Sequence, residues 1–96
     1  METIILRGTD LASRKRAAVI RQEVEDALAH NASIRIDASE TLSISDSYAD
    51  ELFGVLVLKL GLADVTQKIK VFTENNSVLR SVAVAMHRRA NEQKAA

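Results

Sequence analysis

Several residue types are missing or scarce in this chain of 96 residues. Cysteine is absent, which excludes disulfides and thiolate metal sites. Proline is also absent and glycine occurs three times, so no segment has the composition of a linker or a low-complexity tract. Basic and acidic side chains balance at 13 each, so no overall field selects nucleic acid or an anionic membrane.

Long apolar runs are missing as well. The longest uninterrupted one covers residues 52–58, far short of a membrane span. The first residues, Met1-Glu2-Thr3, lack the basic and apolar regions of a signal peptide. We therefore expect a cytoplasmic protein with no membrane partner.

What remains is a chain of the size of one domain, so residues 1–96 are expected to form a single domain with a frayed tail at 89–96. Short β-branched runs alternate with apolar stripes of helical period. Strands are predicted at 3–7, 33–37 and 68–73, and helices at about 14–30, 46–60 and 76–89. This order predicts a compact α/β fold, in which a small, mostly parallel sheet of about three to four strands packs against three helices.

The second predicted helix, residues 46–60, carries the strongest apolar stripe, in which Leu56 is expected to be core. Val57 and Leu58 widen the stripe until most sides of the helix are apolar. Such a helix must bury its outer face too, either against another helix or against a second copy of the chain. A homodimer is therefore one candidate assembly.

The segment leading into this helix, residues 34–54, reads I-R-I-D-A-S-E-T-L-S-I-S-D-S-Y-A-D-E-L-F-G. Asp37-Ala38-Ser39 and Asp46-Ser47 resemble the phosphorylatable loop of STAS domains, the fold of the anti-sigma-factor antagonists. Ser47 to Gly54, S-Y-A-D-E-L-F-G, resembles more closely the helix start of a STAS-like family of unknown function. As a pattern, the similarity extends from about residue 13 to residue 89.

The resemblance implies a STAS-like domain that regulates by protein–protein contact, with no catalytic residues and no cofactor or metal. The partner it implies is a histidine-kinase-like ATPase or an anti-sigma-type regulator. The docking site would be the start of the second helix, and Ser47 would be the candidate phosphoacceptor, although Tyr48 occupies the position of the serine that antagonists phosphorylate. The candidate partner-binding residues are Asp46, Ser47, Tyr48, Asp50 and Glu51.

These residues also have structural interpretations. Ser47 could be an ordinary N-cap, with Asp50 three residues later approximating a capping box. Carboxylates near a helix N-terminus stabilise the helix dipole without any further role. Tyr48, the single tyrosine, is expected to project from the first helical turn as an interface anchor; the alternative is that it folds back over the sheet edge as a lid.

Two further functions stay open. Asp37, Asp46 and Asp50 could hold Mg²⁺ in a receiver-like phosphotransfer or Mg-dependent enzyme domain. Arg14-Lys15-Arg16 could contact an acidic partner, a phosphate or nucleic acid, but nucleic acid is not the expected partner because the chain has only three aromatic residues and no second basic surface on that helix.

Overall fold

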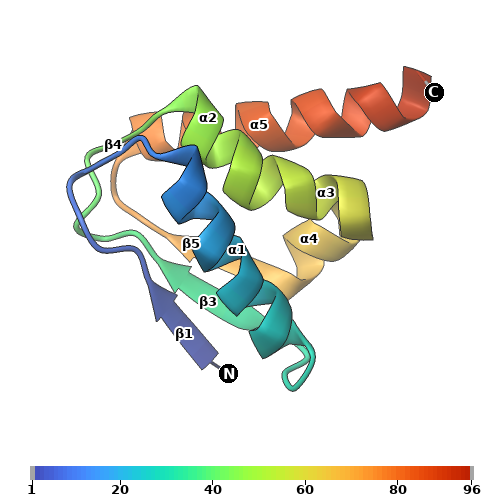
Figure 1. Ribbon diagram of the computed structural model, residues 1–96, viewed down its shortest axis with the longest axis horizontal. Helices are drawn as coiled ribbons and strands as arrows, with labels where there is room; N and C mark the ends of the chain where they lie inside the picture. The colour runs from blue at the N-terminus through green and yellow to red at the C-terminus, as the bar shows by residue number, and fades with distance from the viewer. Residues whose placement is uncertain (1, 96) are drawn as a thin grey trace.

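A three-stranded parallel sheet forms one layer of the computed structural model, which describes residues 2–95 and side chains as far as residue 92. Its strands are β1 (Glu2–Ile5), β3 (Ile34–Asp37) and β5 (Ile69–Phe72), in the spatial order β1-β3-β5 (Figure 1). In their register, Ile4 lies beside Ile36 and Ile36 beside Val71. β-branched residues at alternate positions therefore line one face of the sheet.

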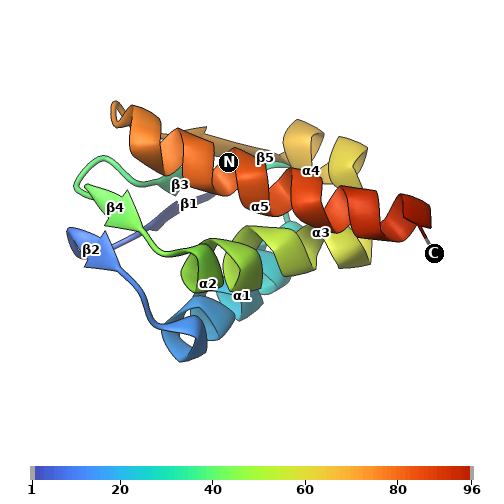
Figure 2. The same ribbon diagram turned by 90° about the horizontal axis from the view of Figure 1, so that it is seen from above.

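The helices form the second layer. They are α1 (Arg14–Leu28), a continuous central helix, α4 (Leu62–Lys68) and α5 (Asn76–Ala95). The central helix consists of α2 (Asp46–Ala49), a single π-helical turn η1 (Asp50–Gly54) and α3 (Val55–Leu60). Figure 2, seen from above, shows α1, the central helix and α5 side by side, with the strands of the main sheet farther from the viewer. No helix within residues 2–95 has the length and apolar character that crossing a membrane requires.

No helix within residues 2–95 covers the other face of the sheet (Figure 2). Ile36 on the inner face is fully buried, whereas its neighbour Arg35 is exposed. On the open face, the Arg35 guanidinium lies 4.2 Å from the centre of the Phe72 ring. Ile5 and Phe72 on this face are 43% and 46% exposed. The domain therefore has two layers.

A second, very short sheet closes the carboxyl end of the main one. It pairs β2 (Asp10–Leu11) with β4 (Ser43–Ile44) in parallel. Gly8, at φ 114°, makes the turn before β2, and its N–H donates to Glu40 Oε1 at 2.7 Å. These contacts fix the segment that enters the central helix.

The hydrophobic core lies between the inner sheet face and the helices. Leu52, Phe53 and Leu56 of the central helix are fully buried, which confirms Leu56 as a core residue. α3 packs against both α4 and α5, and Val57 is also fully buried. The wide apolar surface of this helix is thus covered mainly by other helices of the same chain.

The predicted α/β class and parallel sheet are confirmed, and the expected strands and helices all appear. Helix α4 was not expected from the sequence; it follows directly after Gly61, which ends α3 at φ 90°. The backbone of residues 89–95, expected to be a frayed tail, continues helix α5, and residue 96 lies outside the described residues.

Candidate interaction site at the start of the central helix

The central helix begins at a serine cap, but the capping residue is Ser45. Its backbone is extended (φ −69°, ψ 159°), and its Oγ accepts a hydrogen bond from the N–H of Tyr48 at 3.1 Å. The capping interpretation of Ser47 is therefore wrong, because β4 ends at Ile44 and the helix starts immediately after Ser45. Ser47 Oγ instead donates to the Ala12 carbonyl at 3.3 Å and lies 3.2 Å from Ser45 Oγ.

Tyr48 does not project from the surface. Its side chain is 3% exposed, so the expectation of an exposed anchor is wrong and the folded-back alternative describes it better. Tyr48 precedes Leu52 and Leu56 by one and two helical turns, which places it on the same inward face. Burial raises the pKa of the Tyr48 phenol. This residue is therefore part of the core.

Asp50 is held by arginines from two other helices. Arg89 of α5 donates from Nε to Oδ1 and from Nη2 to Oδ2, both at 2.7 Å. Arg14 of α1 donates from Nη1 to Oδ2 at 3.1 Å. The Arg89 hydrogen bonds, followed by those of Arg14, hold the pKa of Asp50 below its usual range, although partial burial opposes this shift. The paired carboxylate raises the pKa of Arg89 in turn.

Glu51 extends these contacts into a network. Its two carboxylate oxygens accept from Arg14 at 3.0 Å and from Arg21 at 3.1 Å. Arg21 also contacts Glu25 at 2.6 Å, and Lys59 of α3 contacts the other oxygen of Glu25 at 2.9 Å. Asp50 and Glu51 thus join α1, the central helix and α5. The structure uses their charges internally, which makes them poorly suited to contact a partner directly.

Gly54 explains the glycine at the end of the S-Y-A-D-E-L-F-G stretch. A Cβ at this position would lie 2.6 Å from Asp50 Oδ1 and 3.0 Å from Arg89 Cγ. It would also lie 3.4 Å from the Ala85 carbonyl oxygen of α5. Only glycine leaves room for α5 to approach η1 closely enough for Arg89 to reach Asp50. The most specific stretch of the sequence is therefore largely a joint between helices.

A polar hollow of about 330 Å³ opens beside this joint, between the start of α1, the start of the central helix and α5. Asp46 and Arg88 on its rim are exposed, and Ser47 is half-buried. Arg88 forms no salt bridge with any residue that the structure describes. The residues that line the hollow are Arg14, Asp46, Ser47, Asp50, Arg88, Arg89 and Glu92.

The acidic residues considered for Mg²⁺ do not assemble. Asp37 closes a local turn, with Oδ1 accepting from the N–H of Ser39 at 2.9 Å, and hydrogen bonding from Ser39 lowers the pKa of Asp37. Within the described part of the chain, no three Asp, Glu or His side chains are placed to hold a metal ion. Asp50 is occupied by Arg89 and Arg14.

Sequence reasoning missed three cations of this site, because Arg21, Arg88 and Arg89 were not among the candidate residues. Arg14 was noted as part of a basic cluster, and the structure directs it to Asp50 and Glu51. Asp50 and Glu51, adjacent acids on an apolar helix, could have predicted these partners. Half-buried carboxylates require cationic partners, so arginines from other elements were to be expected nearby.

The chain was compared with protein families, curated proteins and solved structures. The model of a family described as a STAS-like domain of unknown function matches residues 16–79. The matched region runs from α1 to the beginning of α5 and includes the whole Ser47–Gly54 stretch. No curated protein and no solved structure matches the chain.

Proposed function

Because the chain belongs to the STAS-like family of unknown function, we propose that it is a regulatory protein–protein interaction module and not an enzyme. The proposed docking region is the Ser47 surface, defined as Asp46, Ser47 and Arg88 around the polar hollow. One observation carries the proposal: a half-buried serine and three arginines line the same open, polar hollow.

This surface differs from the docking site expected from the sequence. Tyr48 lies in the core, and Asp50 and Glu51 bind arginines of α1 and α5. Asp46 and Ser47 remain accessible, and Arg88 joins them from a distant part of the sequence. By the family resemblance, the proposed partner is a histidine-kinase-like ATPase or an anti-sigma-type regulator.

Phosphorylation of Ser47 is the proposed form of regulation. A kinase would transfer the γ-phosphoryl group of ATP to Ser47 Oγ, which loses its proton, and ADP would leave. The phosphate adds about −1.5 to −2 charges beside Arg14 and Arg88. It would compete with Asp50 for Arg14 and satisfy Arg88, which lacks a salt bridge among the described residues. The contacts offered to a partner would thereby change from mixed charge to negative charge.

The experiment compares candidate partners with variants of the surface. A histidine-kinase-like ATPase from the native host is purified, and its affinity is measured by isothermal titration calorimetry. The charge reversal Arg88→Glu should weaken binding about tenfold or more, corresponding to roughly 1.4 kcal/mol. The matched control is Arg80→Glu, because Arg80 is also an exposed arginine of α5 but does not line the hollow.

Regulation is tested with the same partner. Ser47→Asp should change the affinity at least about fivefold relative to wild type, whereas Ser47→Ala should bind normally and lose its response to kinase and ATP. Equal affinities across wild type, Ser47→Asp and Arg88→Glu would show that a bound partner uses another surface. Failure of every such ATPase and anti-sigma-type regulator to bind would reject the proposed partner class.

A further inference from the structure

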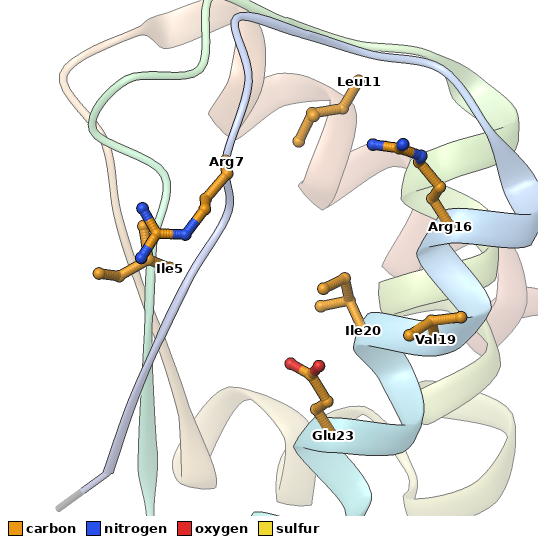
Figure 3. Close-up of a pocket in the computed structure, with 7 residues that line it drawn as sticks. All are labelled: Ile5, Arg7, Leu11, Arg16, Val19, Ile20 and Glu23. Carbon is orange, nitrogen blue, oxygen red and sulfur yellow. The ribbon is translucent and has the colours of Figure 1, made fainter.

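A separate surface follows the open edge of the main sheet. Strand β1 pairs with β3 on one side, and within residues 2–95 no strand pairs with its other side. Adjoining hollows of about 310–420 Å³ lie along this side, from His30 at one end to Ser13 at the other. We name this surface the edge trough; β1 forms one wall and α1 the other (Figure 3).

The backbone of β1 has hydrogen-bonding capacity on this side. The N–H of Leu6, just after β1, donates to the Asp37 carbonyl at 2.8 Å and therefore points toward β3. Successive residues of a strand direct their N–H and C=O groups to opposite sides. The groups of Thr3, Ile5 and Arg7 thus point toward the edge trough. An unpaired edge of this kind is a template for one more strand.

The walls of the edge trough offer apolar contact. Val19 of α1 is a large aliphatic residue that is 58% exposed, whereas Ile5 of β1, 43% exposed, directs its side chain to the open face of the sheet. Figure 3 shows Val19 and Ile20 on the helix side, whereas the side chains of Ile5 and Arg7 point away from α1. Leu11 lines the upper part of the same space. One set of alternate side chains of an added strand would face Val19, Ile20 and Leu11, and the other set would lie beside Ile5 on the open face of the sheet.

Charges at the two ends of the edge trough have opposite signs. Arg7 and Arg16 lie near the carboxyl end of β1, whereas Glu23 and Glu2 lie near its amino end. None of these four side chains forms a salt bridge with a residue that the structure describes. This contrasts with Arg14 and the other arginines of the helix joint. The trough therefore carries uncompensated charge of both signs, separated along its length.

From this arrangement we infer that the edge trough binds an extended segment of a partner protein as a fourth strand beside β1. Charge complementarity specifies the chemistry of the segment: alternating aliphatic side chains, an acidic residue at the end that reaches Arg16, and a basic residue at the end that reaches Glu23. The inference concerns residues outside the Ser47 surface, so a negative result for the Ser47 surface would not contradict it, and the reverse also holds.

The first test uses a blocked heptapeptide with lysine at one end, glutamate at the other, and alternating threonine and valine between them, so that both charges and the valines share the face toward α1. Adding this peptide to the full chain should slow hydrogen exchange of the Thr3, Ile5 and Arg7 amides, measured by NMR. Two isomers carry N-methyl groups on alternate amides in opposite phases. One phase should abolish binding and the other should retain it, because only every second amide of the peptide faces β1.

The second test changes the protein. Val19→Asp and Arg16→Glu should each weaken peptide binding about tenfold or more. The matched controls are Val84→Asp, at an aliphatic residue of α5 that is 44% exposed, and Lys15→Glu, next to Arg16 but outside the lining of the edge trough; both should bind normally. A peptide with lysine in place of its glutamate should restore binding to Arg16→Glu.

Several results would overturn the inference. Unchanged exchange at Thr3, Ile5 and Arg7 at millimolar peptide would exclude strand addition, and equal binding of both N-methyl isomers would exclude backbone pairing. Amides of β1 that become protected with increasing protein concentration alone, in an assembly that Val19→Asp dissociates, would assign the edge to a second copy of the chain instead.

Discussion

The substitution Gly54→Ala tests whether the helix joint depends on close approach of α5. The added methyl group would lie 2.6 Å from Asp50 Oδ1 and 3.0 Å from Arg89 Cγ. Asp50 cannot rotate away freely, because Arg89 holds both of its oxygens at 2.7 Å and Arg14 holds one of them. Either the carboxylate leaves these arginines or α5 moves away from η1.

The expected magnitude combines three effects. Alanine is favoured over glycine inside a helix by about 1 kcal/mol. Forcing a methyl group into a packed interface costs about 1–3 kcal/mol. Loss of one hydrogen bond to a charged group costs a further 1.5–3 kcal/mol or so. Because the two costs exceed the helical preference, Gly54→Ala should lower the free energy of unfolding by about 1.5–5 kcal/mol.

The assay is urea-induced unfolding followed by far-ultraviolet circular dichroism, in two backgrounds. In wild type, Gly54→Ala should be destabilising. In the background Asp50→Ala with Arg89→Ala, the nearest obstacles are gone, and the remaining contact, with the Ala85 carbonyl at 3.4 Å, is an ordinary one. There the same substitution should become stabilising by about 1 kcal/mol. The same destabilisation in both backgrounds would refute the steric argument.

Three other predictions concern the core and the joint. Leu56→Ala should destabilise the protein by about 2–5 kcal/mol in urea unfolding, because Leu56 is fully buried; an unchanged midpoint would contradict this. Tyr48→Ala should cost about 3–5 kcal/mol whether or not a partner is present, and the Tyr48 phenol should titrate, by absorbance, above the usual value of about 10 because burial raises its pKa; normal titration would place it at the surface. Asp50→Asn should cost about 1.5–3 kcal/mol at pH 7. Since the pKa of Asp50 is lowered by folding, its stabilisation is present above the unfolded-state value of about 3.9 and is lost as pH falls through the folded-state value, so wild type and Asp50→Asn should converge in stability as the pH is lowered below the unfolded-state value; a constant difference would rule out the ionised pair as the cause.

The fold was predictable because its strands and longer helices satisfy local patterns. β3 has alternating aliphatic residues, α1 begins at a serine cap, and the central helix carries a continuous apolar stripe. Helix α4 was missed because it has only seven residues and directly follows Gly61, the residue after the predicted helix at 46–60. A segment this short has little periodicity, and its packing against α3 determines its structure.

The candidate site was predicted less well, because its organisation depends on tertiary contacts. The sequence places Asp50 and Glu51 near a helix start, but their arginine partners come from positions up to 39 residues away. The burial of Tyr48, in contrast, could have been predicted from the sequence. Extending the apolar stripe backward from Leu52 by four residues reaches Tyr48 and predicts its burial.

The network that joins the three helices also bears on the rates of folding and unfolding. Asp50 contacts Arg14 and Arg89, which are 36 and 39 residues away in opposite directions along the chain. These contacts require α1, the central helix and α5 to be docked together, so we expect them to form late, after the folding barrier has been crossed.

Interactions absent from the transition state affect mainly the unfolding rate. Loss of the Asp50 contacts should therefore speed unfolding and leave the folding rate nearly unchanged. In a small domain with no disulfide, the joint around Asp50 and Gly54 would then set the lifetime of the native state, and with it the resistance to proteolysis under conditions in which cleavage outpaces refolding.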